Sequence, residues 1–331
     1  MERFVFVAAV TIAIIWGFVA MFGGGRFIHF SGDWDLDADA RMAPLVEVQP
    51  GNMAPQTFTG DHLDLDDLAA NVVIMTEDRS DYVIEIANPA GRAPMPEVTV
   101  EGGRIKVDGR LSRRIERCTE GGADLRDYGL VSAEELPRIT IRAPRNLNVD
   151  RDGAGSLEIG PTGSLELDFA SCGSATLGDV AGALNIDLAG SGHISAGAAQ
   201  SLDADVAGSG ELAVGAVAQG ASVDIAGSGE VRIASLNGDL SADGAGSGNL
   251  SVQGGAINQA SVDLAGSGGV DIAAPVRSLN ASIVGSGSID VAGEVGDIEA
   301  DIAGSGNVRA RAVTGSISKE VWGSGDVRVG G

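Results

Sequence analysis

The chain has 331 residues, and its 46 acidic and 22 basic side chains give a formal charge of −24 at neutral pH. This negative charge argues against binding nucleic acid or anionic lipid through surface charge. Glycine accounts for 50 residues, but it follows no Gly-X-Y period, which excludes collagen. Aromatic residues make up only 4% of the chain, so we expect a narrow core of small and aliphatic side chains.

Residues 1–28 contain an uncharged run from Phe4 to Phe22. Its 19 residues would span about 28 Å as a helix, close to the thickness of the hydrocarbon core of a bilayer. The run is longer than a typical signal peptide core and has no convincing cleavage site. We therefore predict a single-pass anchor in the bacterial inner membrane, with the remaining chain in the periplasm.

Residues 29–55 resemble a tether. Four aspartates alternate with other residues between Asp33 and Asp39. A calcium-binding EF-hand loop would require Gly at its sixth position and Glu at its twelfth, where this chain has Ala38 and Pro44. We interpret the segment as a solvated acidic linker.

Residues 56–145 consist of short alternating apolar runs separated by turn residues, a pattern typical of β-strands. An irregular insert between Gly109 and Leu136 carries four arginines at a spacing that would place them on one face of a short helix. We interpret that face as a solvated one that offsets nearby acids. The four arginines are Arg110, Arg113, Arg114 and Arg117.

Residues 146–331 repeat the triplet Gly-Ser-Gly eight times, at steps of 18 to 20 residues. Two degenerate copies precede the series, at Gly153 and Ser171. Units of this length, each unable to bury its apolar side alone, indicate a stacked array. The triplets begin at Gly190, Gly208, Gly227, Gly246, Gly266, Gly285, Gly304 and Gly323.

Within each unit, apolar residues alternate with polar ones on both sides of the triplet, as in the segment 202–214. This period of two predicts strands, and the triplet predicts a tight corner that needs glycine. We therefore predict an all-β fold: a parallel β-solenoid of about ten coils of 18–20 residues, preceded by a β-rich half and one transmembrane helix.

An acidic residue stands three positions before almost every triplet, and its parity predicts that it points outward. A ladder of like charges is unfavourable unless water, salt or cations screen it. Solvent screening is one interpretation; Ca²⁺ bridging adjacent carboxylates is the other, although the calcium-binding nonapeptide repeat is absent. The candidate calcium column is Asp187, Asp205, Asp224, Asp243, Asp263 and Asp301.

The serine column of the triplets has no recurring histidine beside it, and His193 is the one histidine within the repeats. Stacked hydroxyls that bond to the turn backbone account for the column, so we predict no catalytic and no cofactor-binding residue. We expect Trp322 to cover the open edge of the last coil. A carbohydrate-active enzyme remains an alternative, although exposed aromatic residues that would stack on sugars are scarce.

The two cysteines are Cys118 and Cys172, and Cys172 occupies a corner position where later units have serine. A single pair in an exported domain favours a disulfide, with two free thiols as the alternative.

The Leu136–Pro144 segment and the repeated Asp-x-Ala-Gly-Ser-Gly resemble the GIN-domain family of auto-transporter adhesin heads over residues 56–331. The resemblance implies a right-handed β-helix, exported or bound to the envelope, and it supplies no catalytic residues. We therefore expect a structural or adhesin-like interaction module whose partner is an envelope protein or polysaccharide. A self-assembling envelope scaffold, and hence a homo-oligomer, is a further alternative.

Overall fold

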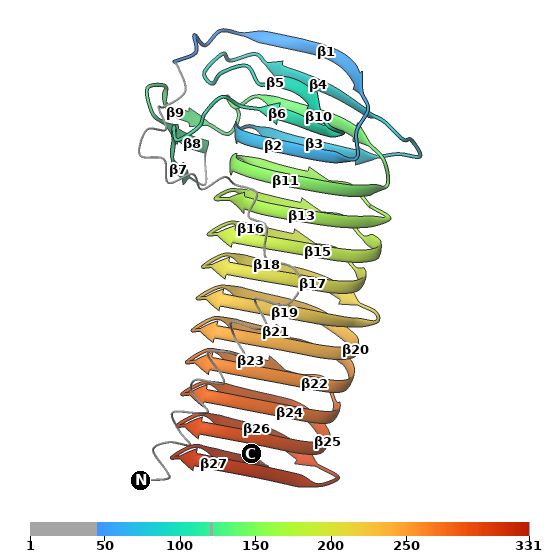
Figure 1. The fold of residues 1–331 in the computed structure, drawn as a ribbon, viewed down its shortest axis with the longest axis vertical. Helices are drawn as coiled ribbons and strands as arrows, with labels where there is room; N and C mark the ends of the chain where they lie inside the picture. The colour runs from blue at the N-terminus through green and yellow to red at the C-terminus, as the bar shows by residue number, and fades with distance from the viewer. Residues whose placement is uncertain (1–44, 120–121, 331) are drawn as a thin grey trace. The chain divides into compact units, whose positions relative to one another are not determined.

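The computed structural model describes residues 45–119 and 122–330, and within them the chain is built of β-strands without a helix (Figure 1). The predicted all-β solenoid is thus confirmed. Since no helix occurs in this part of the chain, none is present there that could span a membrane. The predicted anchor and residues 29–44 of the predicted linker lie outside the described residues.

Residues 146–329 form ten stacked coils, the number expected from the repeat. The strands that precede the corners form the pre-corner face: β11 (Asn146–Ala154), β13 (Ser164–Ser171), β15 (Val180–Gly190), β17 (Ala199–Gly208), β19 (Gly220–Gly227), β22 (Gly255–Gly266), β24 (Val276–Gly285) and β27 (Ile317–Gly323). The strands that follow the corners form the post-corner face: β12 (Ser156–Ile159), β14 (Ser174–Leu177), β16 (His193–Ala196), β18 (Glu211–Val217), β21 (Asn249–Val252), β23 (Gly269–Ile272), β26 (Asn307–Val313) and β28 (Asp326–Val329). Two long strands run from one corner to the next and contribute to both faces: β20 (Glu230–Gly246) and β25 (Ser288–Gly304).

Equivalent residues of successive coils pair in register, so that Leu202 lies beside Leu184 on one side and Ala221 on the other. Parallel strands paired this way are about 4.8 Å apart. Within each strand the apolar residues point inward: Leu202, Ala204 and Val206 are all at most 3% exposed. The interior is therefore a thin column of mostly aliphatic side chains, as the composition predicted.

The corners explain why glycine recurs. Gly208 has a φ of 113°, and a Cβ placed there would lie 2.5 Å from the carbonyl oxygen of Gly190. The amide of Ser209 donates to that same oxygen at 2.8 Å. Gly210 needs glycine for another reason, because its Cβ would lie 2.8 Å from the buried Leu188 side chain. This corner therefore requires a backbone conformation and a close approach that side chains obstruct.

The N-terminal half continues the stack, but not in chain order. β2 (His62–Ala69) and β3 (Asn71–Thr76) form a layer that pairs in parallel with the first coil, β2 with β11 and β3 with β12. β6 (Arg104–Asp108) and β10 (Arg138–Ala143) form the layer beyond it. Antiparallel strands then cover this end, namely β1 (Gly51–Phe58), β4 (Tyr82–Asn88) and β5 (Glu97–Glu101). The predicted strand-rich half thus forms the first layers and the cap of the solenoid.

The insert between β6 and β10 is a small antiparallel sheet of β7 (Ile115–Thr119), β8 (Gly122–Leu125) and β9 (Gly129–Ser132). The predicted arginine-bearing helix is wrong, because Arg110 and Arg113 both have a φ of 57°, which interrupts a right-handed helix. Arg114 is buried and pairs with Asp127, so it does not lie on a solvated face.

The last described coil departs from the interior pattern. Lys319 lies beside the buried Ala300 of the preceding coil, at an inward position, and its Nζ is 3.2 Å from Asp326 Oδ1. Trp322 lies beside Ala303 in an outward column and is 58% exposed. It does not cover the edge of the interior, contrary to the prediction.

Candidate binding surfaces

The predicted acidic column is a ladder on the pre-corner face. Its members are direct register partners from coil to coil, as parallel pairing of equivalent residues requires. We call the column from Asp150 to Asp301 the aspartate ladder, and Ser282 interrupts it. The six predicted calcium candidates all belong to it: Asp187, Asp205, Asp224, Asp243, Asp263 and Asp301.

The central carboxyls of the aspartate ladder are half-buried and hydrogen-bond to one another. Burial, followed by the charge of Asp168, raises the pKa of Asp187 to about 6. Burial and the charge of Asp205 raise the pKa of Asp224 to about 7. Asp205 lies between these two and hydrogen-bonds to both, and its own pKa is raised by burial and by Asp187. Near neutral pH, a protonated carboxyl of the ladder can therefore donate a hydrogen bond to an ionised neighbour. This sharing of protons relieves the repulsion between like charges.

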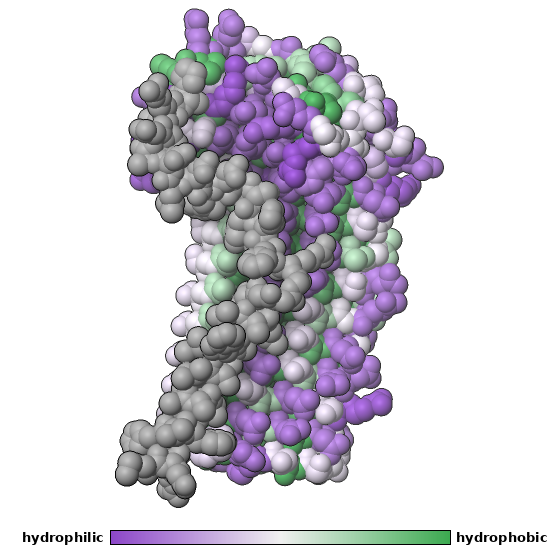
Figure 2. Space-filling model, viewed as in Figure 1, coloured by the Kyte–Doolittle hydropathy of each residue, from purple (hydrophilic) through white to green (hydrophobic). Residues whose placement is uncertain are grey.

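At the N-terminal end of the ladder, Asp150 contacts Arg104 and His62. His62 Nε2 and Arg104 Nη1 each lie 2.7 Å from Asp150 Oδ2. Burial opposes ionisation of Asp150, but the hydrogen bonds from His62 and Arg104 outweigh it and lower the pKa. Hydrophilic side chains gather over these N-terminal layers (Figure 2). The ladder thus begins at an ion-pair network and continues as uncompensated carboxyls.

A second acidic group was missed by the sequence analysis. One carboxylate oxygen from each of Asp66, Asp67 and Asp152 lies within 4.8 Å of the others. Burial and the charge of Asp66 raise the pKa of Asp67 to about 6. Lys106 forms an ion pair with Asp66. The three carboxylates have the donor chemistry of a hard-cation site. No local sequence pattern predicts this group, because Asp152 is distant in sequence from Asp66 and Asp67.

Arg151 is a further residue whose role could not be predicted from the sequence. It occupies an inward position, where the next coil has Phe169, and is only 1% exposed. Its two terminal nitrogens donate to the carbonyl oxygens of Leu68, Ala70, Asp152 and Ala154. Burial lowers the pKa of Arg151 to about 10, still well above neutral pH. The side chain holds together the first coil and the layer next to it.

The serine column lies on the exposed corner edge. Ser305 Oγ and Ser324 Oγ are 3.1 Å apart, as stacked hydroxyls on adjacent coils should be. His193 Nδ1 lies 3.3 Å from Glu211 Oε2, and Glu211 belongs to the next coil of the post-corner face. The structure therefore associates this histidine with a carboxylate.

Cys118 and Cys172 form a disulfide, with their Cα atoms 5.8 Å apart. Cys118 belongs to β7 of the insert, and Cys172 belongs to the corner between β13 and β14. The bond fastens the insert to the corner edge of the solenoid.

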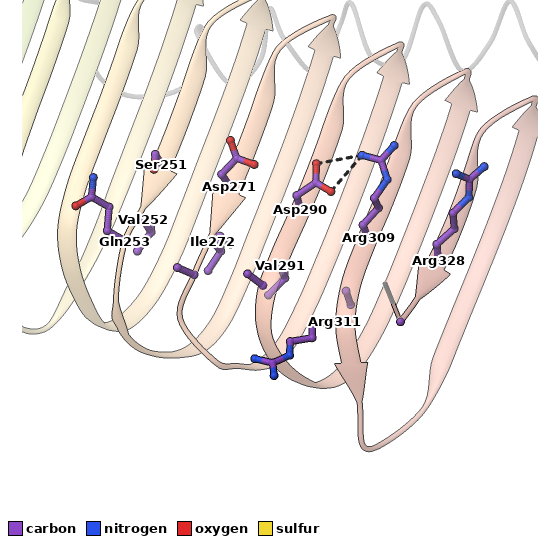
Figure 3. A pocket seen from close by; sticks show the side chains of 14 residues that line it. Ser251, Val252, Gln253, Asp271, Ile272, Asp290, Val291, Arg309, Arg311 and Arg328 are labelled. Carbon is purple, nitrogen blue, oxygen red and sulfur yellow. Dashed lines mark hydrogen bonds and ion pairs between the residues drawn. The ribbon is translucent and has the colours of Figure 1, made fainter.

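The post-corner face carries charges of both signs, paired within coils and between adjacent coils. Arg232 pairs with Glu211 of the preceding coil and with Glu230 at 2.6 Å, and Arg309 Nη1 lies 3.2 Å from Asp290 Oδ1. A groove of about 720 Å³ crosses the last coils of this face (Figure 3). We call it the C-terminal groove; it is lined by Ser251, Val252, Gln253, Asp271, Ile272, Ala273, Asp290, Val291, Ala292, Arg309, Ala310, Arg311, Arg328 and Gly330.

The family model described as "Putative auto-transporter adhesin, head GIN domain" matches residues 207–295 and 244–331. The resemblance to the GIN-domain family is confirmed for these coils. The GIN-domain matches begin at the corner of β17 and cover the C-terminal part of the stack. No curated protein matches the sequence.

Several solved structures are similar to the chain. A "putative adhesin" from Parabacteroides distasonis has 12% identity and a TM-score of 0.42, covering 86% of this chain and 98% of its own. A "putative adhesin" from Parabacteroides merdae has 15% identity and a TM-score of 0.39, covering 86% and 96%. A "putative lipid binding protein" from P. distasonis has 19% identity and a TM-score of 0.39, covering 85% and 96%.

Proposed function

We propose that this chain is a non-enzymatic interaction module of the bacterial envelope. The observation that carries the proposal is the in-register repetition of outward side chains: the same polar position recurs on successive coils along a rigid stack. Such a surface offers a partner many equivalent contacts, so individually weak contacts add up in affinity. The adhesin description of the matching family supports this function.

The proposal includes an anchor at residues 1–28 in the inner membrane and a solenoid in the periplasm. The uncharged run from Phe4 to Phe22 supports the anchor. The disulfide between Cys118 and Cys172 supports an oxidising compartment, because such bonds persist outside the cytosol.

The test is photo-crosslinking of the full chain in intact envelopes. A photoreactive residue replaces one outward, exposed position at a time, such as Ser209 on the corner edge, Asn249 on the post-corner face or Glu299 on the pre-corner face. The buried Val223 is the matched control position. The proposal predicts one recurring envelope protein or glycan adduct from at least one of these surfaces and none from Val223. Absence of any adduct from all three surfaces contradicts it.

The same preparation tests the enzyme alternative. Incubation of the full chain with isolated envelope polysaccharides leaves their chain length unchanged if the module only binds. Shortened polysaccharides would show that the chain cleaves them and would contradict the non-enzymatic part of the proposal.

A further inference from the structure

The C-terminal groove brings three arginines and two aspartates together on the post-corner face of an acidic protein. Arg309 and Arg328 are register partners on adjacent coils, and their side chains are 50% and 60% exposed. Arg311 projects at the opposite side of the groove, with apolar side chains between (Figure 3). Three guanidinium groups therefore surround one groove in a chain whose formal charge is −24.

The partners of these arginines leave hydrogen-bonding capacity unused. Arg309 pairs with Asp290, and Arg328 Nε lies 3.4 Å from Asp326 Oδ2. Arg311 makes no ion pair within residues 45–119 and 122–330. A guanidinium group carries five N–H donors in a planar fork that matches a carboxylate, so each arginine has donors available to a ligand. Because salt screens charges over about 10 Å, the groove's own arginines and aspartates, and not the distant acidic residues, determine which ligand groups it attracts.

The other residues that line the groove indicate which chemical class of ligand would fit it. Asp271 and Asp290 occupy the same register position as Arg309 and Arg328, on the two preceding coils. Along this wall, two hydrogen-bond acceptors are therefore followed by two donors. Small and aliphatic residues complete the lining, among them the exposed Ala273 and Ala292. An extended polymer that carries hydroxyls, carboxylates and apolar ring faces would meet all three features. A lipid phosphate or an inorganic anion would engage the guanidinium groups alone and would leave Asp271, which forms no ion pair among the described residues, without a ligand contact.

We propose that the C-terminal groove binds an acidic polysaccharide, with uronate carboxylates on Arg309 and Arg328 and sugar hydroxyls on Asp271 and Asp290. The inference rests on the proposed interaction function and specifies its partner class. Successive coils present equivalent side chains about 4.8 Å apart, which suits a polymer lying across them. The carboxylate–guanidinium bonds are charge-assisted and supply most of the discrimination.

The test measures binding of the full chain, in detergent micelles, to polygalacturonate and to the same polymer with its carboxyls methyl-esterified. The wild-type chain is expected to bind the free acid and to lose at least about tenfold in affinity for the ester. The variant Arg309→Gln/Arg328→Gln is expected to lose a similar factor toward the free acid. The control Arg138→Gln/Arg277→Gln removes equal charge from exposed sites elsewhere and should bind as the wild type does.

Equal binding of acid and ester, or an unchanged affinity of the groove variant, would overturn the proposal. So would a groove variant that loses binding only to vesicles of anionic phospholipid, which would assign the site to lipid. Urea unfolding of the groove variant checks its fold, and the single variant Arg311→Gln provides an independent readout from the opposite side. If polygalacturonate does not bind but envelope crosslinking persists, the groove proposal fails and the interaction function stands.

Discussion

The corner glycines set the geometry of this protein one residue at a time. Gly227 has a φ of 121°, and an added Cβ would lie 2.5 Å from the carbonyl oxygen of Gly208. We expect Gly227→Ala to lower the free energy of unfolding by about 3 kcal/mol, from backbone strain and the clash together. Urea unfolding monitored by circular dichroism measures the loss.

Gly102 is a matched control for this substitution. Its φ of 58° is also positive, but no atom lies within 4 Å of an added Cβ. We expect Gly102→Ala to cost about 1 kcal/mol, from backbone conformation alone. Equal losses at Gly102 and Gly227 would mean that the corner geometry, with its wider φ and its close stacking, adds nothing to ordinary left-handed strain.

Arg151 is the buried charge that joins the first coil to the layer beside it. Arg151→Leu would fit the aliphatic column but leave four carbonyl oxygens without their guanidinium donor. We expect a loss of about 3 kcal/mol in the free energy of unfolding. The exposed Arg138→Leu is the control, and a gain in stability for Arg151→Leu would contradict this role.

At the scale of elements, the aspartate ladder should make the protein more stable in mild acid. Its raised pKa values, about 6 at Asp187 and about 7 at Asp224, exceed the ordinary 3.8 of aspartate. Between these values the folded chain binds more protons than the unfolded chain, so the free energy of unfolding rises as the pH falls. We expect a gain of about 1 kcal/mol from pH 8 to pH 5, since solvent screens half-exposed groups.

The variant Asp187→Asn/Asp224→Asn should be more stable than the wild type at pH 8 and should lose most of this dependence. Asp67, with a pKa near 6 in the other acidic group, accounts for part of what remains. The exposed pair Glu294→Gln/Glu299→Gln removes the same charge and should leave the dependence intact. A wild-type protein that loses stability between pH 8 and pH 5 would disprove the shared-proton account.

The disulfide links two structural elements, the insert and the solenoid. It closes a sequence separation of 54 residues between the insert and the corner edge. Loss of this constraint on the unfolded chain should lower the free energy of unfolding of Cys118→Ala/Cys172→Ala by about 4 kcal/mol. Wild-type protein without reductant is the reference, and a variant of unchanged stability would mean that the insert is held by its packing alone.

At the scale of the whole molecule, the coils could be predicted from the repeat because each coil is formed by 18–20 consecutive residues. Parity alone placed the aspartate ladder outward, and the Gly-Ser-Gly spacing located every later corner. The layer of β2 and β3 could not be predicted in this way, since it lies between strands that follow it in sequence. The contact of Asp152 with Asp66, and the burial of Arg151, depend on that non-sequential layer.

The last described coil bears on the scaffold alternative. A further copy that stacked on this coil would meet Lys319 at an inward position, paired with Asp326. Inward charges at a sheet edge oppose edge-to-edge pairing. The proposed function therefore rests on lateral recognition by the faces and not on end-to-end growth.

The alignment of the corners along one edge can be measured directly by pulsed electron–electron resonance. Spin labels would be introduced at cysteines replacing Ser209 and one of Ser267, Ser286, Ser305 or Ser324 of the serine column. With strands about 4.8 Å apart, the distance should lengthen by about that increment for each additional coil. Distances that do not increase steadily along this series would contradict the stacked, in-register coils on which the account depends.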